Sequence, residues 1–155
     1  MTVGEARPDD ELTIRRAGPG DGHAVAALAG ELAQSFPFSP ERFRVAYPAL
    51  LADDRACLLV AVRERQYLGY LLGFQHLTFY ANGPVAWVEE VLVASSGRGR
   101  GIGRALMSGF EQWAAARNCT LVALATRRAA PFYHALGYEE SAIYLRKILD
   151  HQASE

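Results

Sequence analysis

A glycine-rich turn between two apolar runs constrains the fold of this chain more than any other segment. The turn, "SSGRGRGIGR", covers residues 95–104 and directly follows the apolar run Val91-Leu92-Val93. After it come an amphipathic segment, residues 101–118, and a short apolar run, residues 120–126, of the kind that is buried on both faces beside a parallel strand. Residues 88–126 therefore predict a β-α-β unit with the turn at the carboxyl end of its first strand, where open α/β sheets bind ligands.

The segments around this unit predict the rest of a mixed α/β domain. Apolar and β-branched runs predict strands at 11–17, 56–66, 67–80 and 85–95, and the last three suggest an antiparallel meander. Helical spacing and capping residues predict helices at 23–36, within 37–54 and at 129–137, the second bent or interrupted at Pro48. One or two strands are expected at 138–149, and a disordered tail at 1–10.

Composition limits the partners and the location of such a chain. Its 155 residues include 16 basic and 17 acidic ones, for a net charge of −1. No overall field would draw it to nucleic acid or to an anionic membrane, so any phosphate site must be local. It has no apolar stretch near the roughly 18 residues of a membrane span and no signal-peptide pattern, so we expect a cytoplasmic protein. Cys57 and Cys119 lack metal-ligand spacing, and no metal site is expected.

The turn has the composition of a loop that binds an anion. A helix start presents several N–H groups without intrahelical partners, and glycines let a phosphate approach them closely. Arg98, Arg100 and Arg104 add positive charge there. The pattern is not a P-loop, because no lysine follows, and the dinucleotide fingerprint fails because Ile102 and Arg104 fall where its third glycine should be. A flexible solvent loop with scattered charge is the structural alternative.

Two separated motifs resemble those of the GCN5-related N-acetyltransferase (GNAT) superfamily. The stretch "RGRGIG", residues 98–103, matches that family's acyl-CoA-binding pattern [RQ]-x-x-G-x-[GA], and "AAPFYHALGYEE", residues 129–140, resembles its later motif. The resemblance covers residues 11–149 and implies one domain whose mixed, mostly antiparallel sheet is flanked by helices on both faces. It also implies an N-acetyltransferase that moves an acetyl group from acetyl-CoA to a primary amine of a small molecule or peptide.

The resemblance further implies which residues bind coenzyme A. In that family the N–H groups of the loop hold the pyrophosphate, and the pantetheine arm lies along the preceding strand like an added strand. An N–H group of that strand, here near Val93, meets the oxyanion that develops at the thioester carbonyl. The positions that correspond in this chain are Leu92, Val93, Arg98, Gly99, Arg100, Gly101, Ile102, Gly103 and Arg104.

Acetyl transfer to an amine needs a base, because a lysine-like amine with a pKa of about 10.4 is neutral in only about one molecule in 2,500 at pH 7. The resemblance places carboxylates at the start of the central strand, where Glu89 and Glu90 point to opposite faces. Parity does not choose between them; we favour Glu90. The leaving thiolate can take a proton from Tyr133, which falls on the position that the family commonly uses as general acid.

The acceptor amine cannot be identified from the sequence. The resemblance places its pocket at the turn between the first two helices and at strand ends across the cleft, so Phe36, Phe38, His76 and Tyr80 are candidate lining residues. These aromatic residues suit an apolar or aromatic amine, although they could simply close the core. His76 is an alternative base. A homodimer is possible. The two other readings are a non-catalytic acyl-CoA-binding regulatory module and an RNA-binding domain that uses "GRGRG".

Overall fold

The structure is a computed structural model of the chain and describes residues 10–33 and 35–150. These residues form two compact units, one that runs to Leu124 and one that begins at Ala125. Of the tail expected at 1–10, all but Asp10 lies outside the described residues. The first unit contains the sheet and the long helices, and the second contains the short helix α4, Ala130–Ala135.

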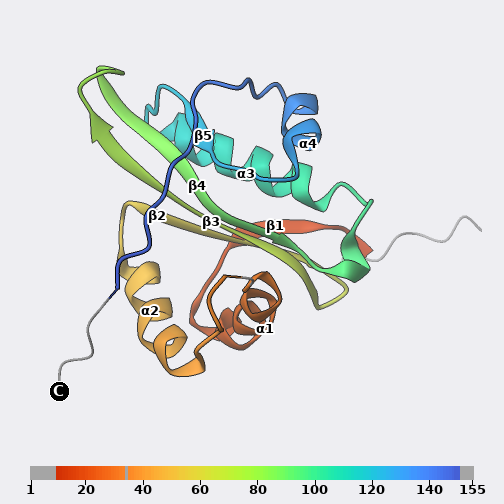
Figure 1. Cartoon of the computed structure of the whole chain (residues 1–155). Helices are drawn as coiled ribbons and strands as arrows, with labels where there is room; N and C mark the ends of the chain where they lie inside the picture. Colours follow the sequence, from red (N-terminus) through yellow and green to blue (C-terminus); the bar gives the residue numbers. More distant parts are fainter. Residues whose placement is uncertain (1–9, 34, 151–155) are drawn as a thin grey trace, which may run out of the picture. The chain divides into compact units, whose positions relative to one another are not determined.

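The sheet of the first unit has five strands in the order β1-β2-β3-β4-β5 (Figure 1). Four of them pair antiparallel, and β5 runs parallel to β4, as the expected meander and β-α-β unit require. This confirms a mixed, mostly antiparallel sheet. The strands are β1 (Thr13–Arg16), β2 (Ala56–Arg63), β3 (Gln66–Thr78), β4 (Gly83–Val93) and β5 (Val122–Leu124).

Helices cover both faces of this sheet, as expected. Figure 1 shows α1 (Gly22–Leu32) and α2 (Pro40–Ala52) on one face and α3 (Ile102–Ala116) on the other. Two short 3-10 turns, Pro19–Asp21 and Ser95–Gly97, precede α1 and follow β4. The start of α2 is capped by Ser39, whose hydroxyl accepts the Arg42 N–H at 3.3 Å.

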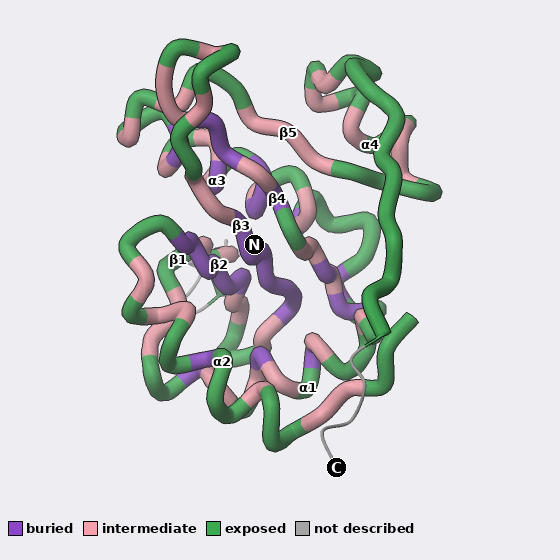
Figure 2. Tube along the Cα trace, turned by 60° about the vertical axis from the view of Figure 1, so that its left-hand side comes forward, coloured by how far each residue is buried: buried purple, intermediate pink, exposed green. Residues whose placement is uncertain are grey.

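The core has one layer on each face of the sheet, and buried residues run along β2, β3 and β4 (Figure 2). On the α1 and α2 face, Val25, Leu28 and Tyr47 pack against strand residues that include Tyr70 and Leu72. The layer under α3 is formed by side chains that are buried on the helix: Ile102, Leu106, Met107, Phe110 and Ala114.

Two glycines of β3 let α3 and β4 come close to that strand. A Cβ added at Gly73 would overlap the Phe110 ring and lie 2.9 Å from the Trp87 carbonyl oxygen, and one at Gly69 would lie 2.6 Å from the Leu92 carbonyl oxygen. Such distances exclude any larger side chain at either position unless neighbours move. The glycines thus help to fix the packing of α3 on the sheet and the position of β4 beside β3.

Two expectations about the elements are wrong, and the interruption allowed for at Pro48 does not occur. The first helix ends at Leu32 rather than at residue 36, because Ala33 is already extended. The second helix runs through Pro48 without interruption, although proline cannot donate to the carbonyl four residues earlier. Residues 138–149 form no strand. A strand needs a neighbour to pair with, and among the described residues of the second unit α4 is the only regular element.

Candidate functional site

The second half of β4 has an open edge in the first unit. Pairing with β5 stops at the partners Val88 and Leu124, while pairing with β3 continues to Val93. The Ala94 N–H donates to the Leu68 carbonyl at 2.8 Å, so the main chain of Ala94 faces β3. Because the direction alternates along a strand, the N–H and C=O groups of Val91 and Val93 face the open side. An extended ligand can therefore pair with β4 there.

A β-bulge interrupts β4 where this edge begins. Gly73 pairs with Val88 and Leu72 pairs with Glu90, which leaves Glu89 as the extra residue. Val88 consequently lies on the α3 face with Gly73, whereas Glu90 lies on the α1 and α2 face with Leu72. The bulge thus decides which glutamate faces the α1 and α2 layer, a choice that strict alternation left open.

Glu90 lies in a half-buried position beside Tyr70, and Glu89 is exposed. The Tyr70 hydroxyl donates to Oε2 of Glu90 at 3.2 Å. Burial raises the pKa of Glu90, the hydrogen bond from Tyr70 opposes that rise, and the negative charge of Glu89 adds to it. A carboxylate with a raised pKa is a stronger base, which suits it to accept a proton.

The glycine loop connects this edge to the start of α3. Gly99 and Gly101 have φ angles of 76° and 75°, in the left-handed region that favours glycine. The first helical hydrogen bond runs from the Ala105 N–H to the Gly101 carbonyl at 3.0 Å. The N–H groups of residues 102–104 precede that bond and have no acceptor within α3, so they are available to an anion.

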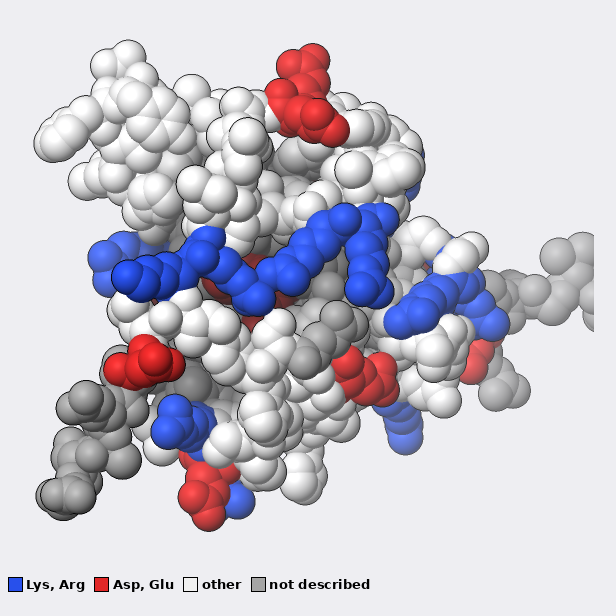
Figure 3. Space-filling model, viewed as in Figure 1, with Lys and Arg blue, Asp and Glu red and all other residues white. Residues whose placement is uncertain are grey.

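The charge of the loop is local. Arg98, Arg100 and Arg104 are exposed, and none of them forms an ion pair with a carboxylate of residues 10–33 or 35–150. The face of the molecule in Figure 3 carries both acidic and basic side chains, in keeping with the net charge of −1. An anion at the loop would thus meet N–H groups of the helix start and guanidinium groups that pair with no carboxylate of the described residues.

Tyr133 belongs to α4 of the second unit. Its ring packs edge-on against Phe132, with 4.9 Å between centroids, and against Tyr138, with 6.0 Å. Gly137, with a φ angle of 92°, follows the end of the helix, where glycine is favoured. Burial raises the pKa of the Tyr133 phenol, so it is protonated at neutral pH and able to donate a proton.

The candidate acceptor residues do not form one cluster. His76 lies four residues along β3 from Leu72, the partner of Glu90, which is about 13 Å. Tyr80 lies beyond the end of β3 and is exposed. Phe38 packs on Phe43, with 5.7 Å between ring centroids. Phe36 is exposed in the loop between α1 and α2.

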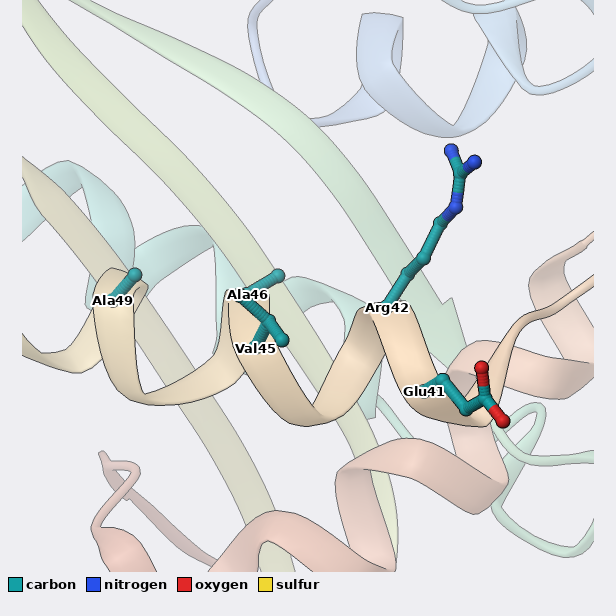
Figure 4. Close-up of a pocket in the computed structure, with 5 residues that line it drawn as sticks. All are labelled: Glu41, Arg42, Val45, Ala46 and Ala49. Atoms are coloured by element: carbon teal, nitrogen blue, oxygen red, sulfur yellow. The ribbon is translucent and has the colours of Figure 1, made fainter. Parts of the chain in front are cut away.

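Two surface hollows of the first unit are lined by residues other than those of the open edge. One is formed by α2 alone, and Figure 4 shows Arg42 extending from the helix beside Ala46 and Ala49. The other lies between β1, β2 and α3, at the opposite end of the sheet's strand order from β5. Neither contains Glu90 or residues of the loop. In the described part of the chain no helix is long and apolar enough to span a bilayer.

Sequence reasoning missed Tyr70 and the bulge. Tyr70 and Leu72 are two positions apart in the apolar run of β3, so alternation alone places them on one face. The sequence alone does not show the strand register that pairs Glu90 with Leu72. That register depends on the bulge, for which "VEEV" carries no recognisable signal.

The chain matches the model of the acetyltransferase (GNAT) family over residues 24–138. A transcriptional regulator from Bacillus halodurans C-125 has a similar structure, with a TM-score of 0.80 and 25% identity over 90% of this chain and 100% of the other. Glucosamine-6-phosphate N-acetyltransferase from Arabidopsis thaliana has a TM-score of 0.80 and 20% identity over 90% of this chain and 99% of the other. Aminoglycoside N-acetyltransferase AAC(6')-Iy, in complex with CoA, has a TM-score of 0.77 and 22% identity over 88% of this chain and 95% of the other. Because the family model matches residues 24–138, which are most of the chain, this protein belongs to the GNAT acetyltransferase family.

Proposed function

We propose that this protein is an acetyl-CoA-dependent N-acetyltransferase that acts on a primary amine of a small molecule or peptide. The open edge of β4 carries the proposal, because it leads into the glycine loop and begins beside the half-buried carboxylate of Glu90. Two similar structures are named for small-molecule substrates, an aminoglycoside and glucosamine-6-phosphate, which favours an acceptor of that size.

Coenzyme A fits the groups that the loop and the strand edge offer. The N–H groups of residues 102–104 would bind the pyrophosphate, with Arg98, Arg100 and Arg104 adding charge. The main chain of Val91 and the carbonyl of Val93 would pair with the pantetheine arm, which carries amide groups and extends like a strand. Bound there, acetyl-CoA supplies an acetyl group activated as a thioester.

The residues of the chain would then supply a base, an acid and an oxyanion donor. Glu90 accepts the proton that the amine loses as its nitrogen attacks the carbonyl carbon. The Val93 N–H donates to the carbonyl oxygen as negative charge develops on it. Tyr133 gives its proton to the departing sulfur. His76, about 13 Å along the sheet from Glu90, is the alternative base.

The first experiment is thermal unfolding of the full chain with acetyl-CoA, with desulfo-CoA, ATP and NAD as comparison ligands. A ligand at 100 times its dissociation constant adds about 2.7 kcal/mol to the free energy of unfolding. We expect a selective rise in Tm with acetyl-CoA and desulfo-CoA. Thiol release in the presence of a panel of amines then identifies the acceptor class.

A matched pair of variants tests the loop. Arg100→Gln should weaken acetyl-CoA binding, while Arg44→Gln, at an exposed arginine on α2, should not. Absence of a shift with any CoA species would overturn the proposal. Selective binding without thiol release across the amines would instead indicate a non-catalytic acyl-CoA-binding module.

A further inference from the structure

We propose that Tyr70 is a positioning residue for the general base: its phenol holds the Glu90 carboxylate in one orientation and in its charged form. The inference rests on the proposed function, because Glu90 acts as a base only if the protein transfers an acetyl group to an amine. It adds a residue of β3 to the part of the site that β4 and the glycine loop form in the first unit.

The position of the Tyr70 hydroxyl is fixed by its surroundings. The residue is 1% exposed, and it packs in the same layer as Val25, Leu28 and Leu72. A buried phenol needs a hydrogen-bond partner, and the acceptor here is Oε2 of Glu90 at 3.2 Å. A donor held by a packed ring restrains the carboxylate that it binds.

Few ionisable groups act on Glu90 from the elements around it. Tyr70 faces it from β3, and Glu89 precedes it on β4. The Tyr67 hydroxyl of β3 is bound to Asp21, and the Tyr47 hydroxyl of α2 donates to the Gly18 carbonyl at 2.6 Å. The other ionisable residues of α1 and α2 are exposed: His23, Glu31, Glu41, Arg42 and Arg44.

Tyr70 is therefore the neighbour that stabilises the charged carboxylate. Burial and the charge of Glu89 both raise the pKa of Glu90, and the hydrogen bond from Tyr70 lowers it. Burial, followed by the charge of Glu90, also holds the pKa of the Tyr70 phenol far above its usual range, so it remains a donor across the working pH range. Loss of this hydroxyl should make Glu90 easier to protonate.

The test is a carbon-13 NMR titration of the Glu90 carboxyl in the full chain, with its resonance assigned by its loss in Glu90→Gln. In Tyr70→Phe we expect the midpoint to move upward by about one pH unit, since a hydrogen bond to a charged group is comparable in free energy to one unit. The acid limb of kcat/KM should move in the same direction. Tyr47→Phe removes a buried hydroxyl of the same layer that binds the Gly18 carbonyl and not Glu90. The midpoint of the Glu90 titration should therefore stay unchanged in that variant.

An unchanged midpoint in folded Tyr70→Phe would overturn the inference. If that variant fails to fold, 3-fluorotyrosine at position 70 keeps the ring and makes the phenol a stronger donor. The midpoint should then move downward, and no movement would again overturn the inference. Failure of the proposed function is separate: a Glu90→Gln protein with full turnover would exclude Glu90 as the base, whatever its titration shows.

Discussion

Glu89 and Glu90 are neighbours in the chain but differ in surroundings. Glu89 is exposed at the bulge, and Glu90 is half-buried and accepts a hydrogen bond from Tyr70. A carboxylate that is partly removed from water is a stronger base and is less well solvated, so the two residues are not equivalent candidates for proton transfer.

Exchange of each glutamate for glutamine should separate their roles. Glu90→Gln should lower kcat by about 100-fold or more, the range for loss of a general base. Glu89→Gln should keep most of the turnover. The acid limb of its kcat/KM profile should move to lower pH, because removal of a neighbouring negative charge lowers the pKa of Glu90. Measurement of kcat/KM from pH 4 to 9 checks both. The reverse ranking would assign the base to Glu89.

Tyr133→Phe tests the proposed acid on the sulfur. We expect turnover to fall about tenfold or more, with little change in acetyl-CoA affinity, because the phenol acts only when the thiolate leaves. Phe132→Leu, at a neighbouring ring that it packs against, controls for disturbed packing of α4. Steady-state kinetics with equilibrium binding distinguishes the roles. Weak binding with normal turnover would make Tyr133 a binding residue instead.

The resemblance gave Glu89 and Glu90 as candidate bases, with His76 as an alternative, and alternation along the strand could not choose between the two glutamates. Alternation places neighbours on opposite faces only while a strand stays regular, and Glu89 is the position where β4 is irregular. Tyr70 was missed for the same reason. The resemblance made His76 and Tyr80 candidates for the acceptor pocket. His76 pairs with Val85 near the end of β3, and Tyr80 lies in the turn that joins β3 to β4.

At the scale of elements, the fit of α3 on β3 depends on Gly73, where a methyl group would overlap Phe110. Gly73→Ala should reduce the free energy of unfolding by about 1–3 kcal/mol, as overpacking of a core does. Gly83→Ala is the matched control, because an added Cβ there has nothing within 4 Å. Urea denaturation compares the two. Equal stability of both variants would mean that α3 can move away from the sheet at little cost.

Elements that bury a patterned face could be predicted, and those that depend on a distant partner could not. The β-α-β unit follows from an apolar run, a glycine loop and an amphipathic helix that are adjacent in the chain. Residues 138–149 alternate well enough for a strand, yet Ile143 and Leu145 are 88% and 86% exposed. Hydrophobic pattern indicates that a segment can join a sheet, but not that it pairs with another strand.

At the scale of the whole molecule, a buried carboxylate ties the first strand to the third. Asp21 accepts two hydrogen bonds from Arg15, at 2.7 and 2.8 Å, one from the Gly18 N–H at 2.7 Å, and one from the Tyr67 hydroxyl. The hydrogen bonds from Arg15 are the main reason that the pKa of Asp21 lies well below its usual range. The charged form of Asp21 therefore stabilises the fold.

The network should make stability depend on acid. Because the folded pKa is depressed, its contribution is present above the unfolded value of about 4 and is lost as pH falls toward the folded value. Asp21→Asn should cost about 1–3 kcal/mol at pH 7 and should flatten the loss of stability below pH 5. Asp54→Asn, at an exposed residue, serves as control. Urea unfolding at several pH values measures this, and parallel slopes for wild type and Asp21→Asn would contradict it.

The bulge in β4 depends on one of two adjacent glutamates, and deletion of either would remove it. Because residues 89 and 90 are both glutamate, deletion of either codon encodes the same shortened chain. That chain could pair regularly with β3 and would still place one glutamate opposite Leu72, next to Tyr70. It would lose the irregularity that coincides with the end of pairing to β5, and with it the local bend that a bulge brings. One repeated glutamate thus separates a β4 that is irregular where its pairing with β5 ends from one that pairs regularly with β3.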